Sequence, residues 1–252
     1  MQAYIPQPVM DAVQQARHLV IFTGAGVSAE SGVHTFRDAL TGLWARFDPA
    51  QLATPDAFMR DPALVWGWYE WRRQLLLKVQ PNAAHHAIAR LQRGLPGVTV
   101  ITQNVDDLHE RAGSRAVLHL HGSIFAPRCF DCARPHAFDA PPQLDHEQAV
   151  EPPRCTDCGG PVRPGVVWFG ESLPETALSA AFAAAESCDC LLSIGTSGVV
   201  HPAALIPTMA SRAGATVIHV NPEPVPVRHA REYSLQGPAG VIVPLLAGGL
   251  PD

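Results

Sequence analysis

The sequence predicts an α/β fold built on a doubly wound parallel sheet. Short runs rich in β-branched residues alternate with helical patterns along the chain, as in parallel sheets covered by helices. The first such strand, at 19–22, runs directly into a Gly-Ala-Gly turn at 24–26, which lets the main chain approach a phosphate. Small or amide residues also follow three later strands, at Gln103, Gly195 and Asn221. Because ligands of open α/β sheets bind outside the carboxyl ends of the strands, this pattern favours a dinucleotide cleft there.

The composition is that of a globular protein with a sizeable core. Of 252 residues, 47% are hydrophobic and 16% are charged, which argues against disorder. The net charge of −5 indicates no nucleic-acid partner. No segment resembles a signal peptide, and none approaches the roughly 18 apolar residues of a membrane span. We therefore expect a cytoplasmic protein with no membrane partner.

Helix and strand patterns alternate through the first half of the chain. Helices are expected at 8–17, 62–79 and 83–93, and strands at 19–22, 98–102 and 117–121. The turn at 24–26 lacks both the full GxGxxG spacing and the lysine of a P-loop, so alone it is compatible with a simple strand-to-helix connection. Residues 34–56 show no period, and a stretch of that length inside a compact domain usually carries function.

The second half continues the alternation after an interruption. Strands are expected at 166–169, 190–194 and 216–220, helices at 174–187 and 202–213, and a last apolar strand or turn at 240–246. Residues 126–165 are rich in Pro, Cys and Gly and lack periodicity, which indicates an inserted module.

Four of the six cysteines form two CxxC pairs separated by 22 residues. This is close to the spacing of tetrathiolate zinc sites. The ligands would be Cys129, Cys132, Cys155 and Cys158. Four thiolates leave no open coordination position, so we expect a structural zinc ion rather than a catalytic one. Two disulfides or a reactive redox pair are the alternatives.

The chain carries an ordered set of motifs, among them a histidine at a strand end. His121 precedes Gly-Ser where a catalytic group can reach the cleft, although a histidine there can also be purely structural. The order GAGVSAESGVHTFR, TQNVDDLH, LHGS, two CxxC pairs, VVWFGE and GTS resembles the sirtuin family of NAD-dependent protein deacylases. The resemblance extends from about residue 8 to residue 245. It implies three modules: a Rossmann-like NAD-binding domain (1–33, 81–123 and 165–252), a cofactor-binding loop with helices (34–80) and a zinc-binding module (124–164).

The resemblance also implies an NAD site at the strand ends, with the 24–26 turn against the pyrophosphate. The implied NAD-binding residues are Gly24, Ala25, Gly26, Ser28, Glu30, Phe36, Arg37, Trp44, Gln103, Asn104, Asp106, Gly195, Thr196, Ser197, Asn221 and Ala239. The irregular 34–56 stretch would be a flap that orders over NAD. The part from Phe36 to Trp44 is slightly longer than in the most similar branch of the family, which leaves its individual contacts open.

The implied reaction consumes NAD rather than exchanging hydride with it. The acyl oxygen of a modified lysine attacks C1′ of the nicotinamide ribose and expels nicotinamide. His121 then acts as general base for the ribose hydroxyls, a task that suits an imidazole near neutral pH. The products are free lysine and O-acyl-ADP-ribose.

The acyl preference is indicated by a Tyr-x-x-Arg pattern within the helix expected at 62–79. Tyr69 and Arg72 lie three residues apart, on one helix face, and resemble the class III pair that binds the carboxylate of succinyl- or malonyl-lysine. Small Ala53 would leave room for the acyl group. The substrate protein would bind as an extended strand along Val167, Phe169 and Gly170.

Four other functions are weighed against this one. A mainly acetyl-directed deacylase and a protein mono-ADP-ribosyltransferase would use the same NAD site. A hydride-transfer dehydrogenase is disfavoured because no ribose-binding acid follows a GxGxxG motif. A zinc ribbon that docks protein or nucleic acid, carried on a Rossmann-like scaffold, is the remaining alternative, and residues 126–165 carry no basic patch to support it.

Overall fold

The computed structural model describes residues 4–33, 52–137, 144 and 146–248. The predicted NAD-binding residues Phe36, Arg37 and Trp44 lie outside these described residues, as does most of the predicted flap. In the described part of the chain, no helix combines the length and the apolar character needed to span a membrane.

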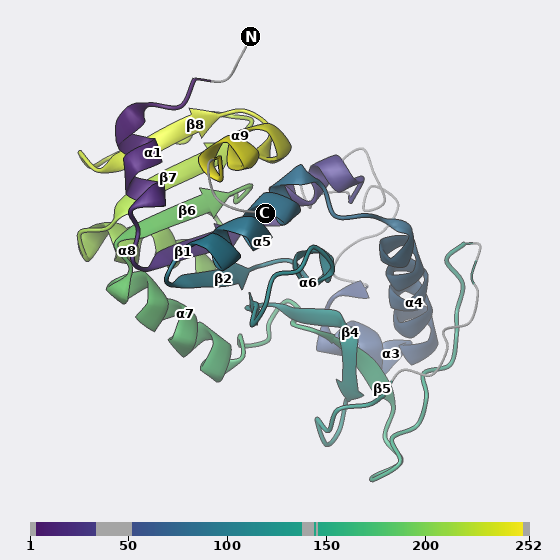
Figure 1. Ribbon diagram of the computed structural model, residues 1–252. Helices are drawn as coiled ribbons and strands as arrows, with labels where there is room; N and C mark the ends of the chain where they lie inside the picture. The colour runs from purple at the N-terminus through teal and green to yellow at the C-terminus, as the bar shows by residue number, and fades with distance from the viewer. Residues whose placement is uncertain (1–3, 34–51, 138–143, 145, 249–252) are drawn as a thin grey trace.

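A six-stranded sheet forms the larger part of the described molecule (Figure 1). Its strands are β1 (Leu19–Thr23), β2 (Val98–Thr102), β3 (Leu118–His119), β6 (Cys190–Ile194), β7 (Thr216–Asn221) and β8 (Glu232–Gln236). They run in the order β3-β2-β1-β6-β7-β8, and every neighbouring pair is parallel. The strand order reverses between β1 and β6, so β1 marks a topological switch point. The predicted doubly wound fold is therefore confirmed.

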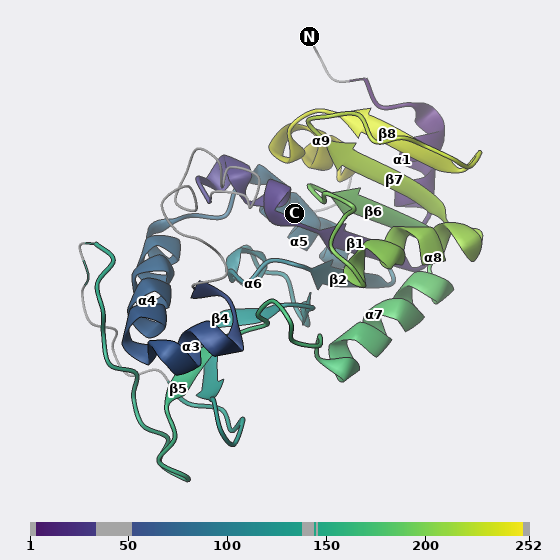
Figure 2. The same ribbon diagram turned by 180° about the vertical axis from the view of Figure 1, so that it is seen from behind.

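Helices cover both faces of the sheet (Figures 1 and 2). One face carries α1 (Gln7–Gln14), α5 (Ala83–Gly94) and α9 (Ala239–Leu246), and the other carries α7 (Glu175–Ser187) and α8 (Ile206–Arg212). All five residues of β1 are buried. Leu19 and Ile21 pack under the first helix layer and Val20 and Phe22 under the second, because successive strand side chains point to opposite faces.

A second, smaller lobe lies beside this sheet. It contains α3 (Pro55–Arg60), α4 (Pro62–Lys78) and an antiparallel pair formed by β4 (Gly122–Cys129) and β5 (Val162–Val166). Each helix begins with a side-chain cap: Thr54 accepts from the amide of Ala57, and Asp61 accepts from that of Leu64. The helices and the strand pair share one hydrophobic cluster rich in aromatic residues, namely Phe58, Trp66, Trp68, Tyr69 and Trp168.

The structure differs from the predicted secondary structure at several places. The strand expected at 117–121 is only Leu118–His119, since the chain turns at 120–121 to enter β4. The strand expected at 166–169 lies at Val162–Val166, where it pairs with β4, and 167–170 forms a turn. The apolar run at 240–246 belongs to helix α9, whose buried Ile242, Val243 and Leu246 match a helical period. Strand β8 was not predicted because its sequence, EYSLQ, is largely polar.

Candidate active site

The Gly-Ala-Gly turn after β1 packs directly against the turn after β6. Gly26 donates its amide to the Gly195 carbonyl at 3.0 Å, and a Cβ on Gly26 would lie 2.6 Å from the Gly195 Cα. A Cβ on Gly24 would lie 2.8 Å from the Gly195 oxygen. Gly195 itself adopts φ +62°, a conformation that glycine reaches without strain. These glycines are therefore required for two backbones to meet, whether or not a ligand is bound.

The amides of this turn are largely used within the protein. Gly24 donates to Ile194, Gly26 to Gly195 and Val27 to Gly24. The segment that follows is not an α-helix but two 3₁₀ turns, η1 (Ala25–Val27) and η2 (Ala29–Ser31). The turn therefore does not present a row of free amides at the N-terminus of an α-helix. Within the described chain, Ala25 is the residue of this turn whose amide has no backbone acceptor.

The ends of β6 and β7 and the start of α9 complete the same edge of the sheet. Thr196 follows β6, and its carbonyl accepts a bond of 3.2 Å from the side chain of Asn221 at the end of β7. Ser197 is exposed, and Ala239 begins α9. Glu30 accepts the amide of Gly240 at 2.7 Å, so its carboxylate connects the segment after β1 to the start of α9. The described members of the predicted NAD set are thus gathered at one sheet edge or next to it.

A buried polar network connects the segments that follow β1 and β2 with helix α5. The Ser28 hydroxyl donates to Asp106 at 3.2 Å and accepts from the Asn104 amide at 3.1 Å. His85 lies 3.4 Å from the same hydroxyl. Burial raises the pKa of Asp106, although its bonds from Leu108 and Ser28 oppose that shift. Ser28, Asn104 and Asp106 were predicted from the sequence, whereas His85 was not.

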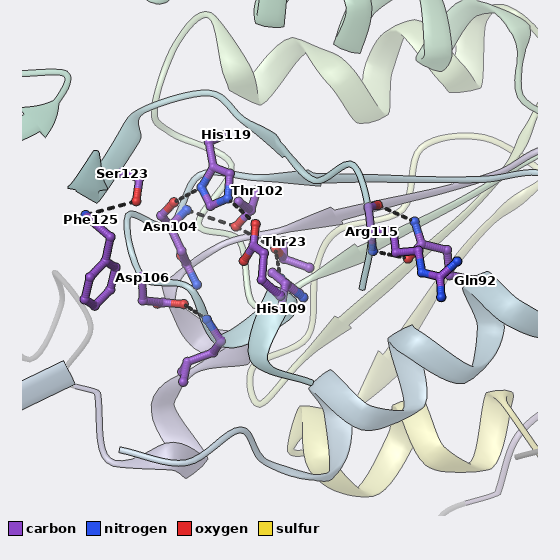
Figure 3. Close-up of polar contacts among 12 residues, drawn as sticks. Thr23, Gln92, Thr102, Asn104, Asp106, His109, Arg115, His119, Ser123 and Phe125 are labelled. Atoms are coloured by element: carbon purple, nitrogen blue, oxygen red, sulfur yellow. Dashed lines mark hydrogen bonds and ion pairs between the residues drawn. The ribbon is translucent and has the colours of Figure 1, made fainter. Parts of the chain in front are cut away.

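Two buried histidines were missed by the sequence analysis. His85 accepts the amide of Asn82 through Nδ1, so its neutral ring presents Nε2–H to Ser28. His109 bonds Thr23 at 2.9 Å, and Thr23 in turn donates to Thr102 (Figure 3). Burial lowers the pKa of His85 to about 4 and that of His109 to about 3. The available signal was a histidine at position 85 inside the apolar stripe of α5, a place where a buried neutral ring needs a polar partner.

His121 lies in the turn between β3 and β4. Its Nδ1 is 2.9 Å from the Gln103 carbonyl, so Nδ1–H is the donor and Nε2 keeps its lone pair. Burial lowers the pKa of His121, and the bond to Gln103 opposes this shift. The ring is therefore a neutral base at pH 7 with a fixed tautomer.

The neighbouring His119 has a different environment. It contacts Glu110 at 2.7 Å and the Asn104 carbonyl at 3.3 Å (Figure 3). Burial lowers the pKa of His119, but the Glu110 carboxylate outweighs burial, and the net shift is upward. The two histidines of the LHLH segment thus have opposite pKa shifts, and His121 is the one suited to accept a proton.

The predicted acyl-binding residues converge in the smaller lobe. Tyr69 is 4% exposed, and its hydroxyl accepts a bond of 3.0 Å from the Trp168 indole. Burial raises the Tyr69 pKa, and the nearby Arg72 guanidinium opposes that shift. The Arg72 Cζ lies 5.4 Å from the ring centre of Trp68. Ala53 is buried in the same hydrophobic cluster as Tyr69 and Trp168.

The predicted peptide-binding segment, 167–170, is held on several sides. Val167 donates its amide to the His121 carbonyl at 2.8 Å, and Phe169 donates to the Ala53 carbonyl at 2.9 Å. The Trp168 amide donates to Glu171 at 2.7 Å. Three successive amides are therefore already bonded, which restricts the groups that this segment can offer to a substrate strand.

The four predicted zinc ligands converge in the smaller lobe. Their sulfur atoms all lie within 4.8 Å of one another, with Cys129–Cys158 at 3.4 Å and Cys132–Cys155 at 3.7 Å. Zn–S bonds of about 2.3 Å in a tetrahedron require sulfur separations of ~3.8 Å, so the cluster fits a zinc ion. The Cys132 amide also points to the Cys129 sulfur at 3.5 Å. The four cysteines are unbridged, and their common cluster favours one zinc ion over two separate disulfides.

This combination of fold and site is similar to known proteins. A model described as the Sir2 family matches residues 24–202. A relative from Pseudomonas aeruginosa, named NAD-dependent protein deacylase 1, is 65% identical over 240 residues, covering 94% of this chain and 96% of the relative.

Solved structures give the same result. A Sir2 homolog in complex with NAD superimposes with a TM-score of 0.87 at 43% identity, covering 98% of this chain and 94% of the other. A Sir2 protein bound to a myristoylated histone peptide has a TM-score of 0.70 at 35% identity, with 95% and 93% covered.

Proposed function

Since the chain belongs to the Sir2 family and is an NAD-dependent protein deacylase, we propose that it acts mainly on succinyl- and malonyl-lysine. NAD supplies the ribose carbon that receives the acyl oxygen, and nicotinamide is released. The residues at the carboxyl ends of β1, β2, β6 and β7 would hold NAD there, with Ala25 and Thr196 at the central switch point. One zinc ion, held by the four cysteines, would stabilise the smaller lobe.

His121 is the proposed general base. Its Nδ1–H is held by the Gln103 carbonyl, so Nε2 can take a proton without a change of tautomer. Its lowered pKa keeps it unprotonated at neutral pH. Its carbonyl also binds the Val167 amide, which links the base to the proposed peptide-binding segment.

The acidic-acyl preference rests on one observation: Arg72 lies at the buried aromatic cluster that contains Ala53 and Tyr69, with its Cζ 5.4 Å from the ring centre of Trp68. A guanidinium and a hydroxyl together can bind a carboxylate through charge-assisted hydrogen bonds. An acetyl group has no charge to offer in return. Succinyl and malonyl groups would therefore gain binding energy that acetyl does not.

The substrate is proposed to be an extended segment of an acylated protein beside residues 167–170. Because the amides of 167–169 are bonded within the chain, pairing would use the Val167 carbonyl and the Gly170 amide. We also propose a cytoplasmic location, where a reducing environment preserves thiolates for zinc.

A peptide assay with NAD tests the acyl preference. We expect kcat/KM to be highest for succinyl- and malonyl-lysine, and Arg72→Met to lower it at least tenfold on these substrates while sparing acetyl-lysine. An Arg72→Met variant that loses both activities equally would contradict the preference. A wild-type enzyme that favours acetyl-lysine would identify a deacetylase. Nicotinamide release with ADP-ribosylated rather than deacylated protein would identify a transferase.

A further inference from the structure

We propose that Trp168 is a positioning residue for acyl selectivity, because its indole N–H occupies a lone pair of the Tyr69 hydroxyl and leaves the O–H to donate to an acyl carboxylate. This inference rests on the proposed preference for acidic acyl groups. It concerns a residue that touches Tyr69 rather than the acyl group.

The indole of Trp168 and the hydroxyl of Tyr69 have complementary hydrogen-bonding groups. Trp168 Nε1 can only donate, and it lies 3.0 Å from Tyr69 Oη. A phenol that accepts from an indole directs its own proton elsewhere. Burial raises the Tyr69 pKa, so that proton is retained at neutral pH. Arg72, one helical turn further along α4, is the electrostatic neighbour on the same hydroxyl.

Trp168 is itself held from its other side. The Arg163 guanidinium stacks on the indole, with Cζ 3.4 Å from the ring centre. Arg163 forms two bonds to Glu171, one of them at 2.9 Å, and Glu171 accepts the Trp168 amide at 2.7 Å. Arg163 is 4% exposed and also donates to the Val166 carbonyl. This closed set of contacts, from β5 through the 167–171 turn, leaves the indole little freedom to turn away from Tyr69.

The consequence is a link between peptide binding and acyl recognition. The same turn donates amides to the carbonyls of His121 and Ala53. A shift of this turn would therefore move the indole that orients Tyr69. A change at Trp168 should thus lower deacylation of succinyl-lysine more than that of acetyl-lysine.

The test is a double-mutant cycle with kcat/KM measured on succinyl- and acetyl-lysine peptides. Trp168→Phe keeps an aromatic ring and removes the donor. We expect it to lower the succinyl-to-acetyl ratio about fivefold, the value of one ordinary hydrogen bond. In a Tyr69→Phe background the same change should leave the ratio unaltered, because the hydroxyl to be oriented is absent. Trp71→Phe, on α4 and packed against the same cluster, is the matched control and should leave the ratio unchanged.

The outcomes separate this inference from the proposed function. A wild-type ratio near one overturns the proposed preference and this inference with it. A high wild-type ratio that Trp168→Phe preserves, or an effect of Trp168→Phe that persists in the Tyr69→Phe background, overturns the inference alone. If Trp168→Phe does not fold, β-(3-benzothienyl)alanine at position 168 removes only the N–H, and the same ratio decides.

Discussion

Gly195→Ala should be among the most destabilising single-methyl additions at the sheet edge. The new Cβ would lie 2.4 Å from the Val27 nitrogen and 2.5 Å from the Gly26 carbonyl carbon, both backbone atoms that cannot rotate away. Gly195 also has φ +62°, which costs an alanine about 1 kcal/mol. Overpacking against the backbone adds about 2 kcal/mol. We expect a total loss of about 3 kcal/mol in the free energy of unfolding.

Gly198→Ala provides the matched control. Gly198 has φ +69°, but a Cβ there would meet nothing within 4 Å. Its substitution should therefore cost only the backbone strain, about 1 kcal/mol. Urea denaturation, followed by circular dichroism without NAD, measures both variants. If Gly195→Ala is no more destabilising than Gly198→Ala, the close approach of the two turns does not contribute to stability as argued.

Three further predictions concern the histidines and the zinc site. For His121, log kcat/KM should fall on the acid side with a midpoint below pH 6.5, because burial lowers its pKa. A midpoint above pH 6.5 contradicts the assignment of His121 as the general base. His121→Tyr should abolish deacylation without unfolding the protein. Cys155→Ser should remove bound zinc and lower Tm, whereas Cys188→Ala, outside the four-cysteine cluster, should retain the metal. Mass spectrometry measures the zinc content, and equal zinc content in the two variants rejects Cys155 as a zinc ligand. His109 has a pKa of about 3 in the folded protein and near 6.5 when unfolded, so the unfolded state takes up a proton first as the pH falls. The free energy of unfolding should therefore decrease by about 2 kcal/mol from pH 7 to pH 5 because of this residue. His109→Gln should reduce this pH dependence of the free energy of unfolding in urea titrations, and an unchanged pH dependence refutes the prediction.

Sequence patterns were sufficient where the information is local. Strand β1 was found from its run of apolar residues, and helix α4 from its own hydrophobic pattern. The zinc ligands were found because the spacing of the two CxxC pairs predicts a tetrathiolate zinc site. The extents of β3 and β5 were not predicted, because pairing with neighbouring strands determines where these strands begin and end. The helical conformation of α9 was not predicted either, because it depends on burial against α5.

The fold class and the family follow from the amino-acid sequence, because strand patterns, cysteine spacing and motif order are local properties of the chain. The contacts that those residues make depend on tertiary packing. His109 bonds Thr23 across 86 positions of the chain, and Trp168 bonds Tyr69 across 99. Contacts of this range depend on how strands, helices and the smaller lobe pack, and the packing of the turns after β1 and β6 likewise uses the amides of Gly24 and Gly26.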